Sequence, residues 1–524
     1  MRTKQIKYSI AALVASVTVT TSCSRFEEMN INRNAVQNTT ATTFVQPTVF
    51  NYEYRMINRS FTLTSQLMQY TVGHQQNADK ISNYRIQNSV AAGYWNDFYS
   101  VGGNAQAMLE QAKKDKNDAA LAVASIIKVI AMSTLTDAYG DVPYFEALQG
   151  YTSGGTEFTP RYDSQKEIYR DMFRLLEEAN TLLAQSKENF DASEDYMYKG
   201  DIKKWRKLGN SIYLRLLMRA ALKDEVDVET ESLFAVSKLN QIFSYPADYP
   251  VFESREDAAD VPFNDAVAAQ QTPFFSWRAG SWNSNMICER LMNEMYVLDS
   301  DENVILSDPR LSFYFDNKRV GAPTQVTYQE LVPYVDIVAH YNRGLIQNRD
   351  HFSIMCFSEI WFIWAEAAHR KWISGTAKSY YDRAVAESIY EWNPDASESI
   401  VSSFLSNPLV SLDGLRDDAA LERIMTQKWI STVLVGIEAW CDYRRTDYPQ
   451  LPIGPDVQNE GVLPTRLGYG QMLISTNGDN YRKQVARMKA AYPVVGRGTA
   501  GGDNMLTPVW WSKRALELEN GAMN

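Results

Sequence analysis

The chain has 524 residues, a formal net charge of −11 and an aromatic content of 12 %. About 500 residues follow Cys23, which is enough for a large hydrophobic core. The acidic charge and the lack of a basic run or stripe argue against nucleic acid as a partner, because an acidic surface repels phosphates.

The first 23 residues predict export and lipid attachment. Three basic residues precede an uncharged apolar stretch over residues 8–19, and the small residues 20–22 stand directly before Cys23. Twelve apolar residues are too few to span a hydrocarbon core of about 30 Å, so residues 1–22 are predicted to be a cleaved signal peptide. A cysteine in this position predicts a bacterial lipoprotein that is acylated, with palmitate among the chains, on Cys23. An ordinary signal with an incidental cysteine is the alternative, since Thr20 stands where leucine is usual.

Residues 23–45 are polar and rich in Asn and Thr, which predicts a flexible lipidated leader. No later apolar run is expected to reach the roughly 18 residues of a spanning helix. The lipid, rather than a spanning segment, is therefore expected to hold the protein at the membrane.

Residues 46–524 are predicted to form a single α-helical domain with little β-structure. Apolar residues recur at steps of three and four in several segments, which are typical of amphipathic helices: 104–137, 168–183, 205–220, 354–373, 376–392 and 421–440. Short breaks between them predict antiparallel pairs. The string from Trp205 to Ile212 (WRKLGNSI) nearly matches the opening of a tetratricopeptide helix pair. A generic helical bundle explains the periodicity equally well.

Long irregular segments rich in Gly, Pro, Asn and aromatic residues separate the predicted helices: 74–94, 188–200, 224–285, 298–350, 393–417 and 445–510. Loops of this length in a compact protein usually bind something. We therefore expect a ligand-binding face built from loops.

Several strings in chain order resemble the SusD/RagB family of outer-membrane lipoproteins. The clearest is Thr136 to Leu148 (TDAYGDVPYFEAL), which resembles the family signature D-x-Y-G-D-V-P-Y-x-E-A. Further strings cover the chain beyond Cys23: WRKLGNS from Trp205, DPRL from Asp308, EAWCDYRRT from Glu438 and the Trp510–Trp511 pair.

The resemblance implies an all-α, SusD-like fold in which tetratricopeptide-like helix pairs pack against a loop-rich ligand face. It also implies a binding protein rather than an enzyme. Such a protein captures an oligosaccharide, or in some cases a peptide, at the cell surface and delivers it to a SusC-like TonB-dependent β-barrel in the outer membrane. Glu27 and Glu28 resemble the family's surface-export signal. The segment 137–146 and the pair Arg444–Arg445 are expected to be structural.

Sugar binding needs exposed aromatic faces beside amide or guanidinium groups, because sugar rings present C–H patches flanked by hydroxyls. Two loops have this composition, although packing in the core is the alternative for their aromatic residues. The predicted ligand-binding residues of the first loop, which begins at His74, are Gln76, Asn77 and Tyr84. Those of the second loop are Phe275, Trp277, Arg278, Trp282 and Asn283.

The sequence singles out no catalytic residue, no metal site and no cofactor. The four histidines lack zinc-binding spacing, and the calcium-like start at Asp299 has Val304 where a calcium loop needs glycine. The literal G-x-G-x-x-G at 496–501 precedes no predicted helix and is expected to be a loop. The three cysteines after Cys23 are few and far apart in the sequence, which favours packing in the core over disulfide bonds. Two alternatives stay open, a surface-tethered glycoside hydrolase with an unrecognised carboxylate pair and a scaffold without a ligand.

Overall fold

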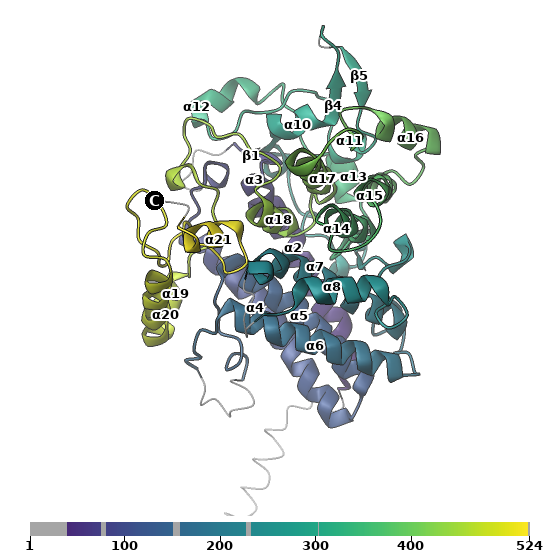
Figure 1. The fold of residues 1–524 in the computed structure, drawn as a ribbon, viewed down its shortest axis with the longest axis vertical. Helices are drawn as coiled ribbons and strands as arrows, with labels where there is room; N and C mark the ends of the chain where they lie inside the picture. The colour runs from purple at the N-terminus through teal and green to yellow at the C-terminus, as the bar shows by residue number, and fades with distance from the viewer. Residues whose placement is uncertain (1–38, 75–79, 150–157, 227–231, 302, 522–524) are drawn as a thin grey trace, which may run out of the picture.

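The computed structural model describes residues 39–74, 80–149, 158–226, 232–301 and 303–521. Helices dominate this part of the chain (Figure 1), which confirms the all-α prediction. The main helices of the first half are α2 (Val45–Arg59), α3 (Ser65–Leu67), α4 (Asn88–Asp115), α5 (Asp118–Tyr139), α6 (Gln165–Gln185) and α7 (Ile202–Val226). Those of the second half are α14 (Phe357–His369), α15 (Ala377–Trp392), α16 (Glu398–Ser406), α17 (Asp417–Ser431) and α18 (Glu438–Thr446).

Helices α4 to α7 lie against one another in chain order and form the helical layer. Local sequence sets their starts. Asn117 caps α5 by accepting a hydrogen bond of 2.9 Å from the Ala120 amide, and Ser164 forms a capping box with Glu167 at the start of α6. The prediction of one helix over 104–137 is wrong, because Lys116 adopts a left-handed conformation with φ of 53° and ends α4. The result is an antiparallel pair.

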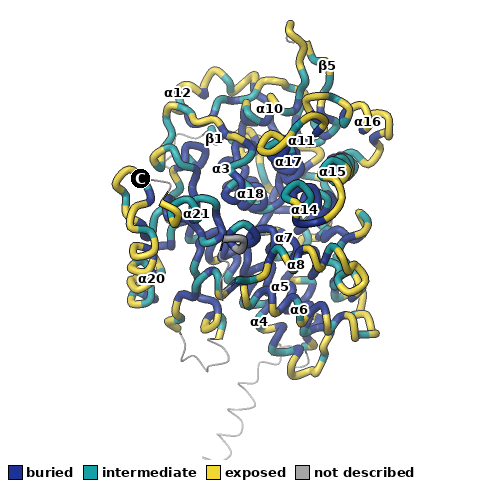
Figure 2. The backbone as a smooth tube through the Cα atoms, in the orientation of Figure 1, coloured by how far each residue is buried: buried dark blue, intermediate teal, exposed yellow. Residues whose placement is uncertain are grey.

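Helix α5 is the central helix of this layer, and almost all of its residues are buried (Figure 2). Among the described residues it is the one helix long and apolar enough to cross a membrane, with a mean hydropathy of 1.9. The expectation that no further run of this kind exists is therefore wrong. However, 89 % of that apolar window is buried inside the protein, as in the core helix of a folded domain.

A second helical group, α14 to α17, has an apolar cluster of its own, which includes Phe362, Tyr381 and Ile424. The stretches predicted at 354–373 and 376–392 correspond to α14 and α15. The stretch predicted at 421–440 is two helices, because the chain turns between α17 and α18 and Gly436 there has a φ of 53°.

The described strands form three two-stranded antiparallel sheets. Strand β1 (Thr71–Gly73) pairs with β3 (Asn285–Ile287), β2 (Asp260–Pro262) with β6 (His351–Ser353), and β4 (Tyr296–Leu298) with β5 (Val304–Ser307). The first two sheets join segments that are far apart in the sequence, as their residue numbers show.

The segments predicted to be irregular contain short helices as well. These are α8 (Ala235–Ser244), α9 (Ala279–Asn283), α11 (Leu311–Tyr314), α12 (Tyr328–Leu331), α13 (Arg343–Gln347), α19 (Gln471–Thr476) and α20 (Gly478–Ala491). Two more short helices, α10 (Glu289–Met295) and α21 (Lys513–Glu519), lie just outside those segments. In α8 the buried residues Ala235, Leu239 and Ile242 follow helical spacing, a signal too short to stand out in a polar context.

Buried ion pairs fasten the helical layer to the second half of the chain. Arg219 of α7 contacts both Asp137, at the end of α5, and Glu438 of α18. Arg445 is fully buried and binds Glu366 of α14 through two guanidinium nitrogens, at 2.5 and 2.7 Å. Asp137 of the signature segment and Arg445 thus have the buried pairing that the structural interpretation predicted.

The packed fold begins earlier than the predicted boundary at residue 46. A short 3-10 helix, η1 (Ala41–Phe44), precedes α2, and its Ala41 is buried. The largest apolar cluster extends from Ala41 to Trp511. Cys288, Cys356 and Cys441 are free and buried, which confirms their interpretation as core residues. The predicted signal peptide, Cys23, Glu27 and Glu28 lie outside the described residues.

Candidate ligand-binding site

The two loops predicted to bind ligand lie next to each other. Strand β1, which leads into the first loop, pairs with β3, which follows the second, and Gly73 lies opposite Asn285. The His74 amide donates a hydrogen bond of 2.8 Å to the Ser284 carbonyl. The strands that border the two loops are therefore neighbours in the fold. Gln76 and Asn77 lie outside the described residues.

Two of the predicted ligand-binding residues are buried, and their expected exposure is wrong. Tyr84 is only 1 % exposed, and burial raises the pKa of its hydroxyl to about 12. Trp282 is only 2 % exposed because its ring packs on Phe61 and Phe274, each with ring centroids 5.3 Å apart. Neither ring has a free face for a sugar.

Trp277 is half-buried, and Arg278 and Asn283 beside it are exposed. The Trp277 ring meets Phe61 edge-on at 5.0 Å, so part of it belongs to the same aromatic cluster as Trp282. Helix α13 braces the segment from outside, since Arg343 donates to the Trp277 carbonyl at 3.3 Å. The three residues form an edge of the surface.

Phe275 points to the other side of the same segment, where it lines a cavity of about 270 Å³ that we call the Phe275 groove. Phe275 is 46 % exposed and Tyr54 is 38 % exposed. The groove is lined by Phe50, Asn51, Tyr54, Ala268, Ala269, Gln271, Thr272, Pro273, Phe275 and Ser276. Gln347 of α13 donates to the Phe275 carbonyl at 3.3 Å and steadies the loop wall.

The opposite wall is helix α2, which places Phe50 and Tyr54 one turn apart on the same face. Their ring centroids are 6.1 Å apart, and Phe50 also packs on Phe263 at 5.0 Å. The buried face of α2 carries Val49 and Met56 instead. The helix thus has an aromatic outer face as well as an apolar inner one.

Sequence reasoning missed Phe50, Asn51 and Tyr54 because aromatic residues in a helix usually pack in the core. The sequence signal that could have revealed these residues was their position in the helix. Phe50 and Tyr54 lie off the stripe of residues that faces the interior, where an amphipathic helix normally carries polar side chains.

The lining of the groove is electrically neutral, since none of its side chains carries a formal charge. Asp265 lies behind it and accepts hydrogen bonds from the Thr272 amide, at 2.8 Å, and from the Thr272 hydroxyl. Asn51, Gln271 and Ser276 supply amide and hydroxyl groups next to the aromatic rings. This chemistry suits a neutral polyhydroxyl ligand better than an ion.

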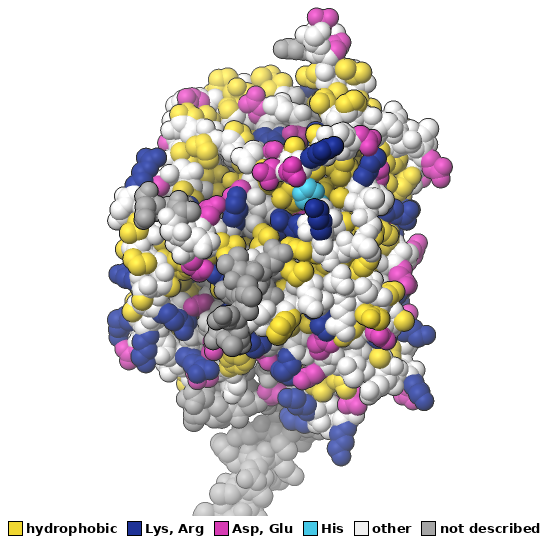
Figure 3. All heavy atoms as spheres, viewed as in Figure 1, with side chains coloured by type: hydrophobic (Ala, Val, Ile, Leu, Met, Phe, Trp, Pro, Cys, Tyr) yellow, Lys and Arg dark blue, Asp and Glu magenta, His cyan; other side chains and the backbone are white. Residues whose placement is uncertain are grey.

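Charged groups elsewhere do not form an obvious metal or nucleic-acid site. No group of three or more His, Cys, Asp or Glu within the described residues could hold a metal ion. The calcium-like string at Asp299 forms the turn between β4 and β5, where the Asp299 carboxylate accepts hydrogen bonds from the amides of Asp301 and Asn303. On the face shown in Figure 3, acidic and basic side chains are interspersed.

The fold is helical, and its surface carries an aromatic groove. A family model described as "Starch-binding associating with outer membrane", SusD-like, matches residues 33–470, and the chain belongs to this SusD-like family. No curated protein matches the chain.

Solved structures of the same fold align over most of the chain. A chitin-binding protein is 26 % identical with a TM-score of 0.71, over 90 % of this chain and 99 % of that one. A chitin-binding SusD homologue from Flavobacterium johnsoniae is 22 % identical with a TM-score of 0.71, over 88 % and 97 %. A SusD homologue from Parabacteroides distasonis is 22 % identical with a TM-score of 0.73, over 90 % and 97 %.

Proposed function

We propose that this protein is a cell-surface lipoprotein, acylated on Cys23, that binds a neutral glycan in the Phe275 groove. It then delivers the glycan to a SusC-like TonB-dependent transporter in the outer membrane. Membership of the SusD-like family is the observation that carries this proposal. The position of Cys23 after residues 20–22 supports the lipid anchor.

The groove supports a glycan as the cargo. Tyr54 and Phe275 offer exposed rings on opposite walls, and stacking adds about 0.5–1.5 kcal/mol for each ring beyond the burial of its area. Two such contacts with a few hydrogen bonds give weak binding, which suits a protein that must release its cargo to a transporter. The two chitin-binding relatives make N-acetylated oligosaccharides the first ligands to test.

The proposed activity is binding without turnover. The groove lining contains no Asp or Glu, so it lacks the pair of carboxylates on which most glycosidases depend. Incubation of the mature protein with oligosaccharides is expected to leave them intact, as measured by chromatography of the products. Hydrolysis would favour the glycosidase alternative.

The groove is tested by calorimetry or affinity electrophoresis with chitin oligosaccharides, starch, other neutral polysaccharides and peptides. We expect Tyr54→Ala and Phe275→Ala each to weaken glycan binding roughly five- to thirtyfold, the loss of one stacking contact and its burial. Tyr245→Ala is the matched control, because Tyr245 is 57 % exposed and lies outside the groove. Equal affinity in all three variants would reject the groove, and binding of peptides alone would reject the glycan.

The edge formed by Trp277, Arg278 and Asn283 is tested separately. Trp277→Ala is a fair probe of ligand contact, whereas Trp282→Ala would open a cavity in the core and confuse binding with stability. Unchanged glycan affinity in Trp277→Ala, together with a loss in Phe275→Ala, would limit the site to the groove.

The lipid anchor is tested by labelled palmitate. Cys23→Ala is expected to abolish incorporation of the label and to release the protein from the membrane fraction. Labelling of the variant at the wild-type level would contradict acylation at this position.

A further inference from the structure

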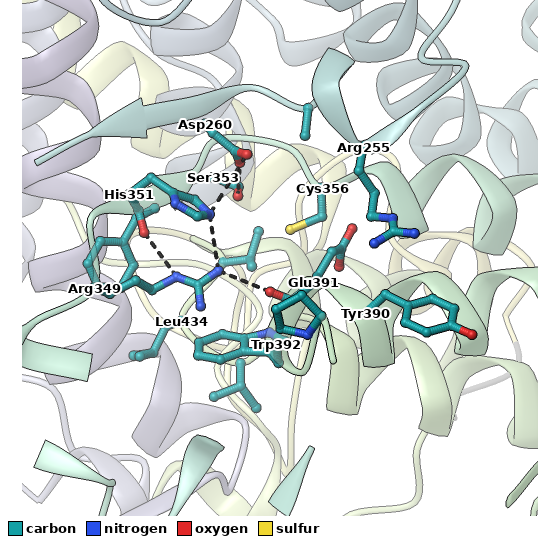
Figure 4. Close-up of a pocket in the computed structure, with 15 residues that line it drawn as sticks. Arg255, Asp260, Arg349, His351, Ser353, Cys356, Tyr390, Glu391, Trp392 and Leu434 are labelled. Atoms are coloured by element: carbon teal, nitrogen blue, oxygen red, sulfur yellow. Dashed lines mark hydrogen bonds and ion pairs between the residues drawn. The ribbon is translucent and has the colours of Figure 1, made fainter. Parts of the chain in front are cut away.

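A second cavity lies between β6, the end of α15 and the turn after α17, and we call it the Arg349 pocket. Its volume is about 250 Å³. Its polar lining residues include Arg255, Asp260, Arg349, His351, Ser353 and Glu391, and its apolar ones include Phe352, Trp392 and Val433 to Val435. Figure 4 shows these side chains around the cavity. None of them belongs to the Phe275 groove.

Arg349 is held rigidly but lacks an acidic partner. Its Nε donates to the His351 carbonyl at 2.9 Å, and one terminal nitrogen contacts His351 Nε2 at 3.3 Å and the Glu391 carbonyl at 3.5 Å. The guanidinium also lies 4.1 Å from the centre of the Trp392 ring. No carboxylate of the described residues lies within ion-pair distance of it. Arginine in a partly buried position is normally paired, because a desolvated charge without a partner is costly. A ligand carboxylate would complete the guanidinium with charge-assisted hydrogen bonds.

Two carboxylates also line the cavity, and in Figure 4 the His351 ring lies between Arg349 and one of them, Asp260. Asp260 is 38 % exposed and accepts a hydrogen bond from Ser353. Glu391 turns its carboxylate inward and accepts from the Ser358 amide, at 2.9 Å, and the Ser358 hydroxyl, at 2.8 Å. Burial raises the pKa of Glu391 to about 7, as expected for a carboxyl group without a nearby cation.

The other charged groups of the pocket are paired already. Arg255 binds Glu387 at 3.0 Å, and His351 binds Asp350 at 2.7 Å. His351 also lies 3.8 Å from the Asp260 carboxylate through its Nε2. The pocket therefore offers a cationic arm without a carboxylate partner, Arg349, and an acidic arm, Asp260 with Glu391. An anion alone would be repelled by the acidic arm, and a cation alone by Arg349, so neither suits the pocket.

We propose that the Arg349 pocket binds a small zwitterion, namely a free α-amino acid with an apolar side chain. The ligand carboxylate pairs with Arg349, its ammonium group faces Asp260 and Glu391, and its side chain contacts Trp392 and the turn at 433–435. The cavity, at about 250 Å³, has the size for a free amino acid rather than for a longer peptide. This site is independent of the glycan groove.

Calorimetry of the purified protein with the apolar amino acids, one at a time, tests the proposal. We expect the best of them, with L-leucine as the first probe, to bind, and N-acetyl-L-leucine and L-leucinamide to bind at least tenfold more weakly. Arg349→Gln and Asp260→Asn are each expected to lower the affinity ten- to hundredfold, the range for a hydrogen bond between charged groups. Arg482→Gln, on the exposed surface of α20, is the matched control.

Each outcome decides the matter. Absence of binding by every apolar amino acid overturns the proposal, as does equal binding of the N-acetyl or amide derivative. Thermal melting of each variant checks that the fold is intact, and Asp260→Asn keeps the test valid if Arg349→Gln unfolds. The glycan experiments separate the two sites: Arg349→Gln is expected to retain glycan binding, and Tyr54→Ala to retain amino-acid binding.

Discussion

Glu53 of α2 is predicted to make the protein less stable as the pH rises. Its side chain is almost fully buried, and one carboxylate oxygen has no hydrogen-bond partner among the described residues. Burial and the negative charge of Asp260 raise the pKa of Glu53 from 4.5 to about 8, while Arg215 acts in the opposite direction. The folded state therefore holds a proton that the unfolded state loses near pH 4.5.

Proton linkage gives the sign and the size of the change in the free energy of unfolding. Below pH 4.5 Glu53 is protonated in both the folded and the unfolded state, so it does not lower the free energy of unfolding. Between pH 4.5 and 8 the folded state binds more protons, so the free energy of unfolding falls by up to about 1.4 kcal/mol for each pH unit. The loss at pH 7 is about 3 kcal/mol from this group, and it levels off above pH 8.

Urea denaturation of the wild type and Glu53→Gln between pH 4 and pH 8 measures this effect. The variant cannot ionise, so its stability relative to wild type is expected to increase by about 3 kcal/mol from pH 4 to pH 7. Glu188→Gln, at an exposed position, is the control, and its free energy of unfolding is expected to change with pH as that of the wild type does. A constant difference between Glu53→Gln and wild type across this range would refute the reasoning.

Two further substitutions test the packing. Glu366→Gln is expected to cost about 3–5 kcal/mol in urea denaturation, because it removes the charge that Arg445 faces in the core; a loss below 1 kcal/mol would contradict a buried pair. Trp282→Ala is expected to cost about 3–5 kcal/mol, the value for a large core aromatic residue, and Trp277→Ala clearly less, as followed by thermal melting. Equal costs would show that Trp277 is as deeply packed as Trp282.

Periodicity predicted the long helices well because their buried faces repeat every three to four residues. Its errors lie at chain reversals. At Gly436 the hydrophobic pattern continues through the turn, and at Lys116 only a short polar stretch separates the two helices. Most of the short helices of the loop-rich half were missed because a few turns give too little periodic signal. Their conformation depends on packing against distant segments.

The candidate site was predictable only in part. Composition pointed to a loop that does line a cavity, through Phe275, but it could not tell Phe275 from its neighbours Phe274 and Trp282, which are buried. Which ring faces outward depends on contacts with Phe61 and α13, far away in the sequence. The opposite wall, with Tyr54, comes from a helix more than 200 positions away, which no local pattern could indicate.

The central claim is that this protein holds a glycan in the Phe275 groove without changing it. The most direct measurement is calorimetric titration of wild type, Phe275→Ala and Tyr245→Ala with the same oligosaccharides, followed by chromatography of the recovered sugar. The account predicts binding by wild type and Tyr245→Ala, weaker binding by Phe275→Ala, and intact sugar in every case. Cleaved sugar, or full affinity in Phe275→Ala, would contradict it.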